Sequence, residues 1–316
     1  MAVGGYFELE LRKGEHYHKN ALKLNTARNC LEYILKVRKY NKVYIPCYIC
    51  EVLLEPFKKC NVLYEFYQIN QKLEPEKEVS LKKGEAFLYI NYFGLKQNCV
   101  EKLSLIYGKQ LIVDNAQAFF EKPISSTDTF YSARKFFGVA DGAYLYIDEN
   151  LQEFIEQDKS YKRMLHLLKR IDTSPDEGFE DYQFNERLLN NIAIKHMSSI
   201  TQRVLSSIDY KSVAKIRRNN FNFLKKELNE SNKLEITRFD NYAPMVYPYF
   251  TNNGAELKRL LIENQIYVAT YWNNELDGTE NFSLEKEFGN NLVPLPVDQR
   301  YNIEQMGKII RCIKNE

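Results

Sequence analysis

The chain has 316 residues, of which 44% are hydrophobic and 27% charged, a composition typical of a folded globular protein rather than a disordered one. Its 44 basic and 42 acidic residues leave a net charge of +2, without the concentrated basic excess of a nucleic-acid binder. No apolar run approaches the roughly 18 to 20 residues of a membrane helix, and no signal sequence opens the chain. We therefore expect a cytoplasmic protein of about two domains, with no nucleic-acid or membrane partner.

The first 150 residues alternate between helical and strand patterns. Helical spacing of apolar residues is seen at 27–38, 50–60 and 100–109, and the expected strands are 42–46, 61–69, 86–94, 110–116, 128–132 and 143–147. These strands are almost continuously apolar, which indicates burial on both faces. The pattern predicts an α/β fold with a mostly parallel central sheet flanked by helices.

From about residue 150 the pattern changes to long amphipathic helices. We expect them at 151–171, 186–208 and 210–228, followed by strands at 244–250 and 267–272 and helices at 255–266 and 303–314. Two strands with two helices make a compact unit. We therefore predict a large domain over 1–208 and a smaller C-terminal α+β domain over 209–316.

A metal site is not expected. Cys47 and Cys50 form a C-x-x-C, but a structural zinc site would need a second pair of cysteines or a nearby histidine pair. The spacing of His16 and His18 does not supply one. We interpret the six cysteines as reduced thiols.

Polar residues gather where the predicted strands end. Asn91, Asp114 and Gln117 lie at the carboxyl ends of strands, 26–29 forms the turn before the first helix, and Lys135 lies in a loop between two strands. Active sites of such sheets lie at the carboxyl ends of the strands. This convergence predicts a site at that edge.

Lys135 fits three catalytic patterns. With Ser132 it makes an S-x-x-K, but the S-D-N and K-T-G segments of such acyl enzymes are missing. With Tyr131 it makes the Y-x-x-x-K of some dehydrogenases, but the first turn has no glycine-rich dinucleotide loop. A lysine that forms an imine with pyridoxal phosphate (PLP) would need a strand-ending carboxylate, for which Asp114 qualifies. It would also need a phosphate cradle at a helix N-terminus, and 25–29 qualifies.

The sequence resembles the DegT/DnrJ/EryC1/StrS family of PLP-dependent sugar aminotransferases, which have the fold-type I architecture. The matching segments occur in order along nearly the whole chain, at 24–35 (LNTARNCLEYIL), 43–50 (VYIPCYIC), 90–94 (INYFG), 113–119 (VDNAQAF), 130–145 (FYSARKFFGVADGAYL) and 291–313. The resemblance implies an aminotransferase that moves an amino group from glutamate or glutamine to a nucleotide-linked keto sugar, for cell-surface polysaccharide or related biosynthesis. It also implies a homodimer with shared active sites.

The resemblance also implies roles for individual residues. Lys135 would hold the cofactor and shuttle the proton, and Asp114 would pair with the pyridinium nitrogen. Gln117 would contact the ring or its phenolic oxygen, and Asn185 would reach the neighbouring subunit's cofactor phosphate. The cofactor-binding residues expected in full are Thr26, Ala27, Arg28, Tyr48, Asn91, Asp114, Gln117, Ser132, Lys135 and Asn185.

Three departures from the family pattern affect the surroundings of the cofactor. The segment before the first helix is short, and Cys50 stands where the family has the aromatic that stacks on the ring, so Tyr48 is the expected substitute. Phe130 replaces a family serine, so Ser132 is expected to contact the phosphate. Two alternatives therefore stay open: a different PLP reaction, such as dehydration of a sugar, and a non-catalytic or regulatory protein with this fold.

Overall fold

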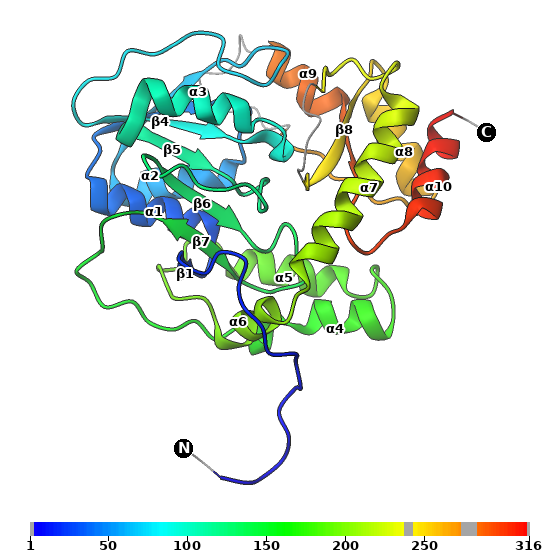
Figure 1. Cartoon of the computed structure of the whole chain (residues 1–316), viewed down its shortest axis with the longest axis horizontal. Coiled ribbons are helices and arrows are strands. Elements are labelled where there is room, and N and C mark those ends of the chain that lie inside the picture. Colours follow the sequence, from blue (N-terminus) through cyan, green and yellow to red (C-terminus); the bar gives the residue numbers. More distant parts are fainter. Residues whose placement is uncertain (1–2, 237–242, 273–282, 315–316) are drawn as a thin grey trace.

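The structure is a computed structural model that describes residues 3–236, 243–272 and 283–314. Its centre is a seven-stranded sheet with the strand order β1-β7-β6-β5-β4-β2-β3 (Figure 1). All neighbours between β3 and β6 pair in parallel, whereas β7 is antiparallel to both β6 and β1. The strands are β1 (Leu22–Leu24), β2 (Lys42–Pro46), β3 (Leu63–Tyr67), β4 (Glu85–Ile90), β5 (Leu111–Asp114), β6 (Asp128–Ser132) and β7 (Ala143–Tyr146). The predicted mostly parallel sheet is confirmed.

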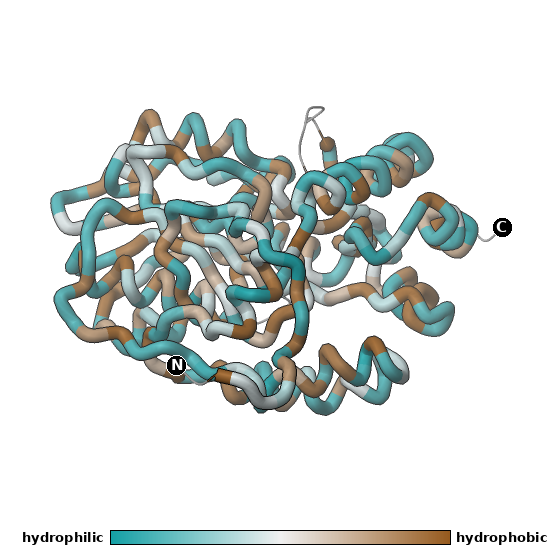
Figure 2. The backbone as a smooth tube through the Cα atoms, turned by 60° about the horizontal axis from the view of Figure 1, so that its bottom comes forward, coloured by the Kyte–Doolittle hydropathy of each residue, from teal (hydrophilic) through white to brown (hydrophobic). Residues whose placement is uncertain are grey.

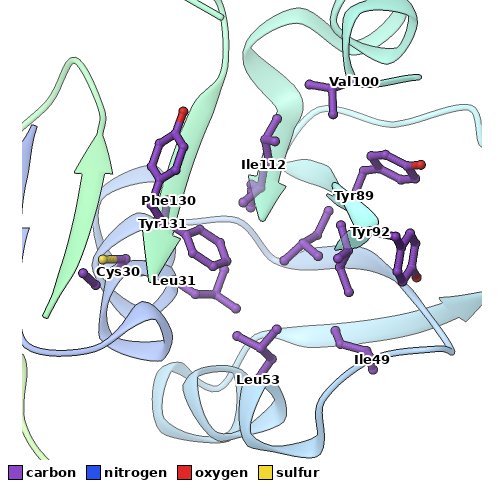
Figure 3. Packing of buried hydrophobic residues seen from close by; sticks show 14 of the residues in the cluster. Cys30, Leu31, Ile49, Leu53, Tyr89, Tyr92, Val100, Ile112, Phe130 and Tyr131 are labelled. Atoms are coloured by element: carbon purple, nitrogen blue, oxygen red, sulfur yellow. The ribbon is translucent and has the colours of Figure 1, made fainter. Parts of the chain in front are cut away.

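The central strands are buried on both faces, as their apolar sequences indicated. Every residue of β4, β5 and β6 is buried. Helices cover the sheet: α1 (Ala27–Arg38) packs on β6 and β7 and against α2 (Glu55–Cys60), and α3 (Gln97–Tyr107) packs on β5. Figure 3 shows part of this interior, with side chains of β5, β6 and α1 directed into one apolar cluster. Short 3₁₀ turns at Glu51–Leu54, Tyr92–Gly94 and Gly108–Gln110 complete the connections.

The segment from 150 to 208 is less helical than predicted. The helices are α4 (Leu165–Asp172), α5 (Phe179–Leu188) and α6 (Ser199–Ser206), with a 3₁₀ turn at Tyr161–Arg163. The predictions of helix at 151–160 and 189–198 were wrong. Backbone groups of these two stretches bond to each other and to the strand β1 instead: the amide of Asp158 donates to the carbonyl of His196 (2.9 Å), and the amide of Met197 donates to the carbonyl of Lys23 (3.1 Å). The edge strand β1 thus pairs with backbone groups near Met197 that would have bonded within a helix if this stretch were helical.

The C-terminal part combines α7 (Tyr210–Leu228), β8 (Val246–Phe250), α8 (Gly254–Glu263), α9 (Ser283–Asn291), β9 (Leu292–Pro296) and α10 (Ile303–Lys314). The strand predicted at 267–272 was wrong, because β8 pairs with β9 in an antiparallel ladder. Pro294 and Pro296 make β9 hard to recognise from the sequence. Proline cannot donate a hydrogen bond to a ladder and is tolerated mainly where one side of a strand is unpaired. A second apolar cluster uses only residues between 221 and 310 in its buried centre. The domain division at residue 208 stays a prediction.

The outer helices alternate between hydrophobic and hydrophilic residues along their turns, which Figure 2 shows as alternating brown and teal. None of the helices in the described part of the chain is long and apolar enough to cross a membrane.

Candidate active site

Asp114 ends strand β5 as a buried carboxylate. Its side chain is 3% exposed, and Oδ1 accepts a hydrogen bond from the Ala116 amide at 2.7 Å. Its backbone carbonyl accepts from the Asn91 amide at 3.0 Å, which joins the ends of β4 and β5. Burial raises the pKa of Asp114 to about 6, although the Ala116 amide and the charge of Lys135 lower it. A carboxylate in this position would be stabilised by a cationic hydrogen-bond donor.

Lys135 lies in the turn between β6 and β7. The turn is closed by hydrogen bonds from the amides of Phe136 and Phe137 to the carbonyl of Ala133, at 3.0 and 2.9 Å. The lysine side chain is exposed, and its Nζ lies 5.6 Å from the centre of the Tyr271 ring. Its ammonium is close enough to Asp114 to lower the pKa of that carboxyl. The structure therefore brings the two residues to one edge of the sheet.

Gln117 is a buried amide with one unused donor. Its Oε1 accepts from the amide of Phe93 at 2.8 Å, which fixes the orientation of the amide group because only an oxygen can accept there. Its Nε2 has no hydrogen-bond partner among the described residues, although the side chain is 1% exposed. A buried amide N–H without an acceptor is costly. An oxygen of a bound ligand would satisfy it.

The N-terminus of α1 has open backbone amides. Thr26 caps the helix: its Oγ1 accepts from the amide of Asn29 at 3.1 Å, and its own amide donates to Asn25 Oδ1 at 3.1 Å. The amides of Ala27 and Arg28 have no acceptor within the described ranges. The side chain of Arg28 is directed elsewhere, to Glu55 at 3.0 Å and Asn190 at 2.9 Å. Only the backbone of this turn is available to an anion.

A glycine places this helix start beside the lysine turn. The amide of Gly142 donates to the carbonyl of Asn25 at 2.6 Å, and its carbonyl accepts from the amide of Ala133 at 3.0 Å. Gly142 has φ +121°, and a Cβ there would lie 3.0 Å from Thr201 Cγ2, so a side chain would be strained as well as crowded. Ser132, buried at the end of β6, lies directly before this corner. The predicted serine and helix start are therefore neighbours.

Two predicted residues, Tyr48 and Asn91, have structural partners of their own. Tyr48 is buried, with its ring 4.7 Å from Trp272 and 5.8 Å from Tyr92 between centroids. Asn91 uses its side chain to hold the turn into α3, where Oδ1 accepts from the Lys96 amide at 2.9 Å. Tyr48 therefore packs among aromatic side chains of its own chain, and its stacking on a cofactor ring stays a prediction. Asn91 shapes the end of β4 through its backbone amide and through the turn that its side chain holds.

Asn185 on α5 is fully buried and donates through Nδ2 to the carbonyl of Ala140 at 3.1 Å. Its Oδ1 has no partner in the described part of the chain. Ala140 belongs to the loop after Lys135, so Asn185 supports that loop within its own chain. An oxygen is an acceptor, so the unpaired atom does not suit a phosphate.

Two residues at this edge could not be predicted from the sequence. Tyr271, whose ring lies below Lys135, falls in a stretch interpreted as a strand, and burial raises its pKa. Phe93 is a buried non-glycine residue with φ +58°, a left-handed conformation that is held by Gln117. No spacing pattern marks either position.

Comparisons with known proteins place this geometry in context. No family model and no curated protein matches the sequence. Among solved structures, the chain is similar over 93% of its length to the sugar aminotransferase CalS13 from Micromonospora echinospora (12% identity, 87% of that chain, TM-score 0.61). It is similar over the same share to a DegT DnrJ EryC1 StrS aminotransferase from Brucella abortus (13% identity, 85% of that chain, TM-score 0.62). NtdA from Bacillus subtilis, with bound cofactor PMP, gives 10% identity, 72% of that chain and a TM-score of 0.67.

These similarities establish the fold. The mostly parallel sheet with its flanking helices is the fold of these aminotransferases, as the sequence resemblance predicted.

Proposed function

We propose that this chain is a PLP-dependent aminotransferase. The observation that supports this proposal best is the set of polar groups at one edge of the sheet: a buried carboxyl at Asp114, a donor at Gln117 Nε2 without a partner among the described residues, and open amides at the start of α1. PLP offers a partner for each, namely a pyridinium N–H, a phenolic oxygen and a phosphate. The residues present therefore fit this cofactor.

The bound cofactor supplies an aldehyde that condenses with amines and a ring that takes up electrons from the substrate carbon. Lys135 Nζ would hold the cofactor before the reaction and then carry the proton of the substrate α-carbon. Asp114 would keep a proton on the ring nitrogen, and Gln117 Nε2 would donate to the phenolic oxygen. The amides of Ala27 and Arg28, with the hydroxyl of Ser132, would bind the phosphate.

The proposed substrates rest on the family resemblance and on the structural similarity to the sugar aminotransferase CalS13. We infer an amino donor of the glutamate or glutamine type and a nucleotide-linked keto sugar as acceptor, with a role in cell-surface polysaccharide or related biosynthesis. A cytoplasmic location is part of the same proposal, and the six free cysteines are consistent with it.

We also infer a homodimer, because α4 and α5 carry large apolar side chains that remain exposed in the described chain. Such a patch on a folded chain is typical of an interaction surface. The exposed large apolar residues on these two helices are Leu165, Leu168, Ile171, Phe179, Tyr182, Phe184 and Leu188. The same hairpin carries Asn185 next to the loop of Lys135, so the interface would lie beside the site.

The test is turnover with an amino donor. Purified protein is incubated with PLP and glutamate, and 2-oxoglutarate is quantified in a single turnover; Lys135→Ala is the variant and Lys109→Ala, at a surface ion pair with Asp148, is the matched control. We expect about one 2-oxoglutarate per site from wild type and from the control, and none from Lys135→Ala. Binding of PLP without release of 2-oxoglutarate from glutamate, or of 2-oxoglutaramate from glutamine, would favour the non-catalytic alternative.

A further inference from the structure

A series of hydrogen bonds leads from Gln117 into the C-terminal part of the chain. Gln117 Oε1 accepts from the amide of Phe93 at 2.8 Å, and the carbonyl of Phe93 accepts from the amide of Met245 at 3.0 Å. Met245 directly precedes strand β8. Phe93 is therefore held from both sides in its left-handed conformation, by the large sheet and by the C-terminal part.

The series continues through Arg217 on α7 and returns to the lysine turn. Arg217 Nη1 donates to the carbonyls of Pro244 and Met245, both at 3.2 Å. Its Nε donates to Gln299 Oε1 at 2.9 Å, and Gln299 Nε2 donates to the carbonyl of Phe136 at 2.8 Å. Arg217 Nη2 approaches the same carbonyl at 3.4 Å. Phe136 is the residue after Lys135, so the two sides of the proposed cofactor site meet at Arg217.

Arg217 is an unusual residue for this position. Its side chain is 1% exposed, and no carboxylate in the described ranges accepts a hydrogen bond from it. Burial lowers its pKa to about 10, against the raising effect of the Asp298 charge. A buried cation costs several kcal/mol unless its donors are satisfied. Here three backbone carbonyls, the Gln299 amide and the Phe136 ring, 4.5 Å from Cζ, provide that compensation.

The guanidinium geometry explains why an arginine is present. Its planar group donates in several fixed directions at once, whereas a lysine ammonium is a single point on a flexible stem. Arg217 also fixes the orientation of Gln299, because the amide oxygen must face Nε and the amide nitrogen is then left to face Phe136. The two side chains thus act as one unit.

We propose that Arg217 and Gln299 form a clamp that positions the Lys135 turn, so that the lysine and Gln117 take their places only when the C-terminal part is docked. The role of Lys135 as the cofactor-binding lysine in this inference rests on the proposed function. The hydrogen bonds of the clamp are present in the cofactor-free chain. Arg217 and Gln299 are positioning residues, since neither side chain contacts the groups proposed to bind PLP.

The test is hydrogen exchange of the cofactor-free protein, followed by mass spectrometry of peptides that cover 133–142. Gln299→Glu is the sharpest variant: its carboxylate keeps the contact with Arg217, but its second oxygen faces the Phe136 carbonyl and repels it. Gln299→Met and Arg217→Met remove the bonds outright. Arg300→Met is the matched control, because Arg300 is a neighbouring arginine that pairs with Asp298 at the surface.

We expect exchange in 133–142 to rise by about tenfold or more in Gln299→Glu and Arg217→Met, with β4 and β5 peptides unchanged. Arg300→Met should leave all peptides at the wild-type rate. Unchanged exchange in 133–142 for both Gln299 variants would overturn the clamp, and so would a uniform rise across the whole chain, which would show loss of global stability only.

A second readout separates the clamp from the proposed function. The rate at which added PLP develops a lysine-linked absorption band is measured for wild type and Gln299→Glu. A band that forms about tenfold more slowly in the variant supports positioning of Lys135. A wild-type chain that never forms the band, but whose 133–142 exchange responds to the substitutions, would contradict the aminotransferase proposal and leave the clamp standing.

Discussion

The amide of Phe93 donates to Gln117 Oε1 at 2.8 Å, and this bond leaves Gln117 Nε2 as a buried donor without a partner among the described residues. One side chain therefore has two separable tasks. Its oxygen stabilises a left-handed, non-glycine residue, and its nitrogen is available to a ligand.

The first prediction separates these tasks. Gln117→Glu keeps an acceptor for the Phe93 amide but replaces the free donor by a second oxygen, whereas Gln117→Leu removes both. We expect Gln117→Leu to lower the free energy of unfolding by about 1–3 kcal/mol, because the Phe93 amide is left unpaired. Gln117→Glu should stay closer to wild type in stability but bind PLP more weakly. Denaturant melts and PLP titrations measure the two effects; equal PLP affinity of Gln117→Glu and wild type would remove Gln117 from the site.

The second prediction concerns the pH dependence of stability through Asp114. Folding raises its pKa from the model-peptide range to about 6, chiefly by burial, so the unfolded state releases this proton more readily than the folded state. The contribution of Asp114 to the stability of the cofactor-free wild type should therefore fall as pH rises from about 4 to about 6, by up to about 3 kcal/mol, and no further above that.

Asp114→Asn isolates this effect from that of other carboxyls. The variant should match wild type near pH 4 and exceed it in free energy of unfolding at pH 8, both without cofactor. Denaturation series at several pH values give the difference. A difference that does not change between pH 4 and pH 8 would show that Asp114 is not a destabilised buried carboxyl.

The third prediction addresses the start of α1. Thr26→Ala removes the oxygen that accepts from the Asn29 amide and should cost about 0.5–2 kcal/mol of stability, while Thr26→Ser should retain the cap. Because a frayed first turn misplaces the amides of Ala27 and Arg28, Thr26→Ala should also weaken PLP binding. Binding of PLP with wild-type affinity by Thr26→Ala would show that the phosphate is held elsewhere.

The fourth prediction concerns the apolar surface of α4 and α5. Leu168 and Ile171 are 51% and 81% exposed, and replacing both by glutamate would place two charges in the proposed interface. We expect this double variant to sediment as a monomer while wild type sediments as a dimer. Leu105→Glu, at an 89% exposed position on α3, is the control and should stay dimeric. Wild type that sediments as a monomer would contradict the proposed assembly.

Much of the sheet could be predicted because its strands are buried on both faces and therefore read as apolar runs. The end of β5 at Asp114 and the start of α1 after Thr26 were visible for the same reason, since polar residues interrupt those runs. The segment near His196 was misread because its backbone bonds to β1 and to the stretch 156–158, both far away in the sequence, and local periodicity does not report such contacts.

The part of the site that could not be predicted from the sequence depends on contacts between residues far apart in the chain. Arg217 and Gln299 are 82 residues apart and meet Phe136 through bonds that no motif encodes. The left-handed backbone of Phe93 likewise follows from its partners Gln117 and Met245 rather than from its own identity. Such positions become apparent only when the fold brings their partners together.

The near-visible absorption spectrum of the purified protein, with and without added PLP, tests the central claim most directly when wild type is measured beside Lys135→Ala. The account predicts a yellow absorption band in wild type only, which decays on addition of glutamate as the amino group is transferred. Absence of the band from wild type after addition of PLP, or an equal band in Lys135→Ala, would contradict the assignment of Lys135 and with it the proposed activity.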